Sequence, residues 1–152
     1  MEQINTETKT DSTESDKKTQ ILEFGLGDEI YCLDINVIDE IVDANDLTPI
    51  PNSAPHVEGV MDLRGRTTTI VNPNTVFNSG QDGVQNRIIV LDPDVVDDDT
   101  TIGWIVDEVY QVRTVTREMI DEGTTANDEN VQAIVKTDDK FVVWVSPGIA
   151  TA

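Results

Sequence analysis

The sequence predicts a mainly β fold whose short strands form small barrels or a sandwich. Short stretches in which apolar and polar residues alternate recur along the chain, and this is the spacing of strands. Gly, Pro, Asn and Asp interrupt these stretches about every ten residues. Helical spacing is confined to a few short segments. Each half of the 152-residue chain offers several strands and one or two short helices, which favours two similar small barrels side by side.

The first predicted element of this β pattern is a hairpin. A strand over residues 21–26 is followed by a Gly-Asp turn and by a return strand over residues 30–35. Asn36 can cap a helix, and the apolar residues of 37–42 recur at helical spacing. A short amphipathic helix is therefore expected directly after the hairpin.

The rest of the chain adds further strands and two short helices. The stretch Arg64-Gly65-Arg66 predicts a turn between two strands. One helical turn is expected over residues 73–77, because Pro is acceptable at a helix start, and a second over 116–120, where a threonine can cap it. The predicted strands are runs rich in β-branched residues: 57–63, 67–71, 87–91, 101–106, 110–115, 131–136 and 141–145.

One folded domain is expected over residues 19–147. Residues 1–18 are polar and cannot bury enough apolar surface to offset the entropy of ordering, so a disordered arm is expected there. The Gly-containing loop 78–85 marks the expected midpoint between two subdomains, with strand exchange between the halves left open. Residues 148–152 are expected to form a C-terminal tail.

Acidity is the main feature of the composition. Thirty Asp and Glu residues face ten Lys and Arg residues, for a formal net charge of −20. Such a surface repels phosphate backbones and anionic lipid surfaces, so no nucleic-acid binding is expected. Self-repulsion of this kind favours a host with a salty cytosol, because the screening length falls to about 3 Å at molar salt.

The sequence also bears on location. No apolar run approaches the length of a membrane span, so direct membrane insertion is not expected. The polar N-terminal stretch lacks the apolar segment of a secretory signal. The protein is therefore expected to be cytoplasmic.

No catalytic residue, metal site or cofactor is expected. The single cysteine, Cys32, lies in an apolar run with acidic surroundings and is expected to be a small buried hydrophobic residue. His56 is the only histidine, and neither a nucleophile motif nor a phosphate-binding loop accompanies it. A small metal-dependent hydrolase using the many carboxylates is the alternative from another class, although such a site usually includes His.

Five blocks of sequence stand in a characteristic order: 24–35, 38–42, 48–52, 55–66 and 102–109. The most specific stretch, Gly-Val-Met-Asp-Leu-Arg-Gly at 59–65, is close to the Gly-Val-x-Asn-Leu-Arg-Gly signature of the CheW family. The block at 102–109 is similar to the family's Val-Gly-x-x-Val-Asp-x-Val stretch. With correct order and spacing over about residues 19–147, the chain resembles a lone CheW domain.

The resemblance implies two SH3-like five-stranded β-barrel subdomains packed around a shared hydrophobic core, with a few short helices. It implies an adaptor without enzymatic activity. Family members couple the cytoplasmic signalling tip of chemoreceptors to the regulatory domain of the histidine kinase CheA. A cytoplasmic protein of this kind is recruited to membrane-associated receptor arrays. A CheW-like scaffold for a kinase pathway outside chemotaxis is the alternative that the sequence leaves open.

The resemblance also implies receptor-binding residues. Glu40 and Arg64 match family residues implicated in receptor coupling, and a contact between them would lock the expected helix to the turn. Two unrelated surface charges are the alternative. Ile38 and Ile41 belong to the helix's apolar stripe, which is either core or a groove for a receptor helix, with Ile38 the more exposed. Gly65 is expected to adopt a positive φ in the turn.

Two further glycines and three strand residues complete the candidates. Gly59 and Gly103 lie within or beside strands, where a missing side chain permits close approach, and the family places binding effects at such glycines. Val109, Tyr110 and Val112 are the candidates for contact with the kinase. Nothing in the local sequence separates the exposed from the buried members of this set.

Overall fold

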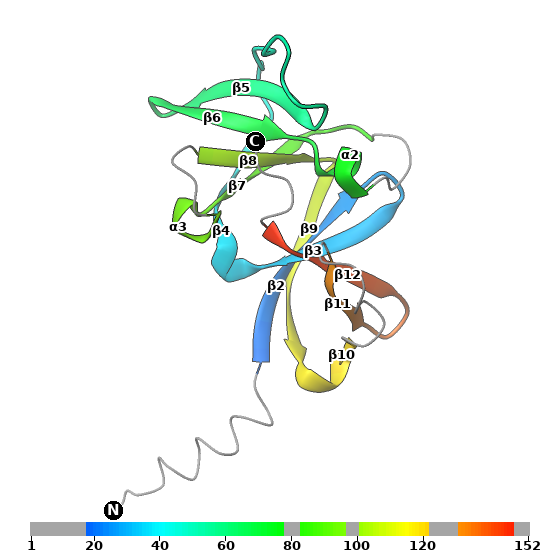
Figure 1. Ribbon diagram of the computed structural model, residues 1–152. Helices are drawn as coiled ribbons and strands as arrows, with labels where there is room; N and C mark the ends of the chain where they lie inside the picture. Colours follow the sequence, from blue (N-terminus) through cyan, green and yellow to red (C-terminus); the bar gives the residue numbers. More distant parts are fainter. Residues whose placement is uncertain (1–17, 78–82, 97–100, 122–130, 148–152) are drawn as a thin grey trace, which may run out of the picture.

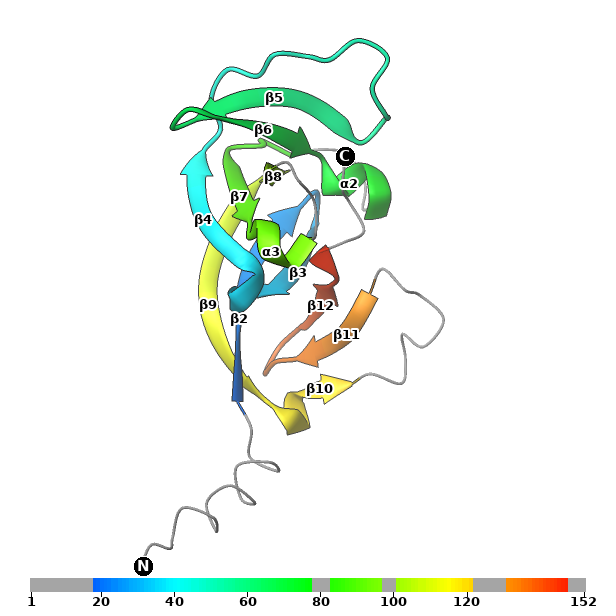
Figure 2. The same cartoon turned by 60° about the vertical axis from the view of Figure 1, so that its left-hand side comes forward.

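The computed structural model describes residues 18–77, 83–96, 101–121 and 131–147. Its strands form two sheets, and in both views the five-stranded sheet lies above the six-stranded one (Figure 1; Figure 2). Of the regions expected from the sequence, residues 1–17 of the arm, residues 78–82 of the midpoint loop and the tail 148–152 lie outside the described residues.

The six-stranded sheet combines strands from both ends of the described chain. Its order is β10-β11-β12-β3-β2-β9, and all neighbours are antiparallel except the parallel pair β12 and β3. The strands are β2 (Lys18–Leu26), β3 (Glu29–Asp34), β9 (Glu108–Thr116), β10 (Ile120–Asp121), β11 (Val131–Lys136) and β12 (Phe141–Val145).

The five-stranded sheet is built from the middle of the chain. Its order is β4-β7-β8-β6-β5, and β6 and β8 form its parallel pair. The strands are β4 (Ile38–Asp43), β5 (Val57–Leu63), β6 (Arg66–Val71), β7 (Arg87–Leu91) and β8 (Thr101–Val106). The short helices are the 3₁₀ turns η1 (Ile35–Val37) and η2 (Arg117–Met119) and the α-helical turns α2 (Pro73–Phe77) and α3 (Pro93–Val96).

Neither sheet is a closed barrel, but in each one the chain connects the two edges. In the six-stranded sheet, β9 at one edge continues through η2 into β10 at the opposite edge. In the five-stranded sheet, Thr48, which follows edge strand β4, exchanges two backbone hydrogen bonds of 2.9 Å with Val60 of edge strand β5. The expected pair of SH3-like β subdomains is therefore confirmed, with six strands rather than five in one of them.

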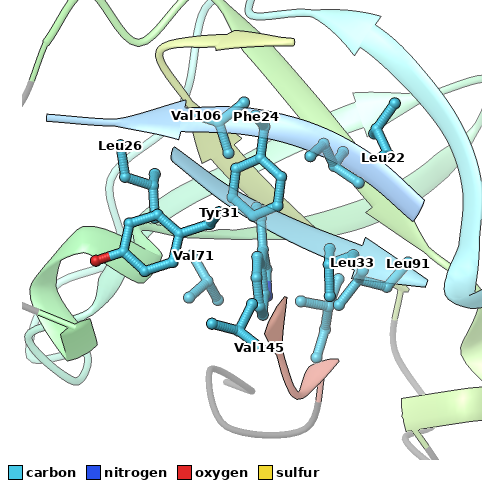
Figure 3. Close-up of a cluster of buried hydrophobic side chains, with 12 residues drawn as sticks. Leu22, Phe24, Leu26, Tyr31, Leu33, Val71, Leu91, Val106 and Val145 are labelled. Atoms are coloured by element: carbon cyan, nitrogen blue, oxygen red, sulfur yellow. The ribbon is translucent and has the colours of Figure 1, made fainter. Parts of the chain in front are cut away.

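Buried apolar side chains form three layers. One layer lies between the two sheets and takes side chains from both, which confirms the expected shared core. Each sheet also encloses a layer of its own. Strand β7 alternates between them, because Ile88 and Val90 face the interior of the five-stranded sheet while Ile89 and Leu91 face the shared core. Figure 3 labels nine residues of the shared core: Leu22, Phe24, Leu26, Tyr31, Leu33, Val71, Leu91, Val106 and Val145.

The helix expected over residues 37–42 is wrong. A single 3₁₀ turn, capped by the side chain of Asp34 through a 2.9 Å bond from the backbone N–H of Asn36, leads directly into β4. The register of β4 against β7 shifts between Ile38 and Glu40. This bulge brings Ile38 and Ile41, three positions apart, onto the same core, so their helical spacing arises from a bulged strand.

The second short helix is also smaller than expected. It is the 3₁₀ turn Arg117–Met119, and Thr116 at its start gives no side-chain cap bond. The helical turn expected over residues 73–77 is confirmed as α2.

The chain does not divide at the segment 78–85. Helix α2 precedes this segment and β7 follows it, and β6 pairs with β8 across it, so both sides belong to the five-stranded sheet. The chain passes between the sheets at η1 and at Asp107, and the first hairpin pairs with the last strands. Similar numbers of strand signals in the two halves do not determine which strands pair, and this is why the expected midpoint is wrong.

Candidate functional site

The charged pair singled out from the sequence is in contact. Glu40 lies on β4, Arg64 is the first residue of the β5–β6 turn, and Arg64 Nη2 donates a hydrogen bond to Glu40 Oε2. The expected contact is therefore present, although a strand rather than a helix carries Glu40. Since β4 and β5 are the two edges of the five-stranded sheet, this bond ties the β5–β6 turn to the opposite edge.

The contact shifts the titration of both partners. The hydrogen bond from Arg64 holds the pKa of Glu40 below its usual value, and the positive charges of Arg64 and Arg66 act in the same direction. The same bond raises the pKa of Arg64. The Arg64 side chain is 66% exposed, so water screens the pair and its contribution to stability is small. Its main effect is to define where the turn lies.

Two further ion pairs flank this contact on β4. Arg66 Nη2 lies 3.8 Å from Asp39 Oδ2, and Arg87 Nε lies 3.4 Å from Asp43 Oδ1. Three carboxylates of β4 thus face three arginines, two beside the β5–β6 turn and one on β7. Neither flanking pair is predicted from the sequence. Asp43 and Arg87 lie directly opposite each other on β4 and β7. Their ion pair therefore follows from the strand register, which the sequence alone does not give.

The β5–β6 turn has an uncommon backbone. Gly65 has φ 85°, so the expected positive φ is confirmed, and Arg64 also has a positive φ of 53°. Positive φ at both central residues is the pattern of a type I′ hairpin turn. A non-glycine residue in this region costs about 1–2 kcal/mol. The turn therefore holds Arg64 in a strained conformation that its bond to Glu40 helps to maintain.

The two isoleucines of the candidate set are half-buried. Ile38 and Ile41 both pack against the shared core, from the bulged part of β4. Neither forms the exposed apolar stripe of a helix, and Ile38 is half-buried like Ile41 rather than exposed. Their side chains instead fix the backbone that carries Glu40.

Gly59 is required by a close backbone approach. A Cβ at this position would lie 2.5 Å from the carbonyl oxygen of Thr48, and its φ of 152° is one that other residues rarely adopt. The glycine thus lets the segment after β4 cross β5 and form the bridge between Thr48 and Val60. Gly59 therefore acts through this close backbone approach, and it contributes no side chain of its own.

Gly103 is buried in the middle of β8. A Cβ there would lie 2.6 Å from Cγ2 of Ile88 and 3.2 Å from Cδ1 of Ile70, inside the five-stranded sheet. This packing accounts for the glycine. Since it is buried, Gly103 offers no surface for direct contact with a partner.

The three candidates on β9 have different environments. Val109 packs against the shared core, whereas Tyr110 and Val112 are 47% and 48% exposed. The register of β9 against β2 skips Tyr110, which makes it the extra residue of a bulge. Partial burial raises the pKa of Tyr110, and the negative charges of Glu108 and Asp107 add to this effect. Tyr110 and Val112 are therefore the members of this set that a partner can touch.

Cys32 is buried, as expected from the sequence, and it packs in the interior of the six-stranded sheet. Burial raises the pKa of its thiol, and the charges of Glu23 and Asp34 raise it further. Across the described ranges, no three His, Cys, Asp or Glu side chains lie where they could hold a metal ion. None of the helices in those ranges has the length and apolar character needed to cross a membrane.

The fold defines a class of small β proteins in which two curled sheets share one core. The sequence model of the CheW-like domain matches residues 20–148 of this chain. The chain belongs to the CheW family.

Individual relatives agree with this assignment. The chemotaxis protein CheW of Thermotoga maritima is 27% identical over 132 residues, and the alignment covers 85% of each chain. The chemotaxis protein CheW of Treponema pallidum is 27% identical over 135 residues, covering 85% of this chain and 79% of the relative. The structure is similar to that of the scaffolding protein TtCheW from Thermoanaerobacter tengcongensis, with a TM-score of 0.75, 28% identity and coverage of 85% of this chain and 84% of that one.

Proposed function

We propose that this protein is a chemotaxis adaptor that couples the signalling tip of chemoreceptors to the regulatory domain of a CheA-type histidine kinase. Membership of the CheW family over residues 20–148 and the likeness to a scaffolding protein support this proposal. The protein acts by contact and not by catalysis. It works in the cytoplasm and is recruited to membrane-associated receptor arrays by its partners.

The receptor contact is the β4 surface, defined as Ile38, Glu40, Ile41, Arg64 and Gly65. The observation that carries this part is the hydrogen bond between Glu40 and Arg64, which fixes the signature turn against β4. Arg64 stays 66% exposed while it makes this bond, so its guanidinium can also meet a receptor group. The half-buried isoleucines hold β4 in place beneath it.

The kinase contact is the β9 surface, defined as Val109, Tyr110 and Val112. Its exposed members are the aromatic ring of Tyr110 and the β-branched side chain of Val112, and aromatic residues are enriched among those that dominate the energetics of interfaces. The β4 and β9 surfaces belong to different sheets. This separation supports simultaneous contact with both partners.

A co-sedimentation assay tests the proposal. The protein is mixed in molar KCl with a receptor signalling fragment and with the regulatory domain of the CheA-type kinase from the same organism. Arg64→Glu should abolish receptor binding and retain kinase binding, while Tyr110→Ala should weaken kinase binding and leave receptor binding unchanged. Arg117→Glu, at an exposed arginine on η2, is the matched control and should change neither.

Two results would contradict the proposal. Receptor binding that survives Arg64→Glu unchanged would remove the β4 surface, provided that the variant's thermal melt matches that of the parent. Binding to neither partner by the unmodified chain would remove the adaptor function in this pathway. In that case a pull-down from the host's lysate that recovers a different kinase would support the alternative of a CheW-like scaffold outside chemotaxis.

A further inference from the structure

The exposed ring of Tyr110 lies over a glycine on the neighbouring strand. Gly25 is a buried residue of β2, and a Cβ built on it would lie 2.9 Å from Oη of Tyr110, 3.3 Å from Cε2 and 3.4 Å from Cζ. These three atoms belong to one side of the ring and its hydroxyl. The ring can rest in this place only because residue 25 has no side chain.

Backbone geometry does not account for this glycine. Gly25 lies inside a nine-residue strand, paired with both β3 and β9, and its φ is not among the positive values found at Gly27, Gly59 and Gly65. A glycine in a strand interior weakens the strand, since it loses more conformational entropy and packs nothing. The contact with Tyr110 is the feature that explains it.

The backbone around Tyr110 is fixed on both sides. Val109 before it packs into the shared core. Gln111 after it donates a 3.3 Å hydrogen bond through Nε2 to the buried carboxylate of Glu23 on β2. Tyr110 is the bulged residue between these two anchors, so its side chain direction is set by them and its ring position by Gly25.

We propose that Gly25 is a positioning residue for kinase binding, which holds the half-exposed ring of Tyr110 against β2 as a pre-ordered aromatic contact. This inference rests on the proposed kinase role of the β9 surface. A ring already held in place loses less freedom when a partner covers it, and affinity gained in this way needs no additional contact. The partner is the kinase regulatory domain, and the group it meets is one face and the hydroxyl of a fixed phenol ring.

Gly25→Ala tests this role. The atoms that the new methyl group meets are at the far end of a side chain, so the ring can move aside and the fold can be kept. Kinase affinity, measured by titration calorimetry in molar KCl, should fall roughly five- to tenfold. Receptor binding should stay unchanged, and Gln20→Ala, at an exposed position of the same strand, should change neither affinity.

A double-mutant cycle separates positioning from a merely structural effect. In a Tyr110→Ala background, Gly25→Ala should cause no further loss of kinase affinity, because no ring remains to be positioned. An NMR spectrum of protein labelled at tyrosine gives a second readout. The chain has two tyrosines, and Gly25→Ala should shift and broaden the ring signal of Tyr110 while leaving that of Tyr31 in place.

The outcomes distinguish this inference from the proposed function. If Tyr110→Ala leaves kinase binding unchanged, the assignment of the β9 surface fails. If Tyr110→Ala weakens binding and Gly25→Ala does not, the surface stands and the positioning role is overturned. A loss of receptor binding in Gly25→Ala, or an equal further loss in the Tyr110→Ala background, would also overturn it, because either result indicates general damage to the fold.

Discussion

Replacing Arg113 by Met would test the buried ion cluster inside the six-stranded sheet. Glu23 is fully buried, and its carboxylate lies 2.5 Å from Arg113 Nε, 3.3 Å from Gln111 Nε2 and 3.8 Å from Lys140 Nζ. Arg113→Met removes the nearest cation and leaves the carboxylate buried. Loss of one partner of a buried ion pair costs about 3–5 kcal/mol, and we expect about 3 kcal/mol because Lys140 and Gln111 remain.

Removing the carboxylate should cost less than removing the arginine. The side chains of Arg113 and Lys140 are 29% and 35% exposed, so both can turn to water when Glu23 no longer attracts them. Glu23→Gln also keeps the size of the side chain and one of its two acceptor oxygens. We expect it to cost about 1–2 kcal/mol. The difference between the two variants follows from the complete burial of Glu23 and the partial exposure of its partners.

Urea unfolding and thermal melts in molar KCl would measure the free energy of unfolding and the melting temperature of both variants. In a chain of this size, 1 kcal/mol corresponds to about 2–4 °C in the melting temperature, so Arg113→Met should melt about 6–12 °C below the parent. Arg117→Met, which changes an exposed arginine, should stay within about 0.5 kcal/mol of the parent. A cost for Arg113→Met equal to or smaller than that of Glu23→Gln would refute this reasoning.

Further predictions concern two glycines, the pH dependence of the Glu40–Arg64 pair and the effect of salt on stability. Gly59→Ala forces a Cβ to within 2.5 Å of a backbone carbonyl and should cost about 2–4 kcal/mol, whereas Gly65→Ala meets nothing within 4 Å and should cost about 1 kcal/mol in urea unfolding. Because Arg64 lowers the pKa of Glu40, their pair stabilises the fold above the ordinary Glu pKa of about 4.3 and loses this effect as pH falls through the lowered value. An NMR titration should show the Glu40 pKa rise in Arg64→Gln, and an unchanged value would contradict the assignment. With a net charge of −20, the melting temperature should rise between dilute buffer and molar KCl, and a flat response would argue against salt adaptation.

Much of the architecture could be predicted from local sequence patterns. The strands over 57–63, 87–91 and 141–145 lie where alternation and turn residues place them. The contact between Glu40 and Arg64 also follows from the resemblance to the family. These features depend on short-range signals or on a matched motif, which a single sequence contains.

Other features depend on pairings that are distant in the sequence. Alternation places Glu23 on the face of β2 opposite Leu22 and Phe24, which in a two-layer sandwich is the solvent face. In this structure that face is the interior of a curled sheet, so the carboxylate is buried and needs Arg113 from β9. Bulges have the same effect on a smaller scale. The bulge in β4 gives its apolar residues the spacing of a helix. The bulge in β9 turns Tyr110 outward while Val109 stays in the core.

The joining of both chain ends in one sheet has a consequence for biosynthesis. Strands β2 and β3 emerge first from the ribosome, yet their neighbours β9 and β12 are translated only after the whole five-stranded sheet. Until then the apolar faces of the first hairpin have no native cover, and pairing over such a distance in sequence is slow. A nascent chain of this protein is therefore most exposed to aggregation and proteolysis before its last strand is complete, and loss of β12 would leave β3 unpaired on one side.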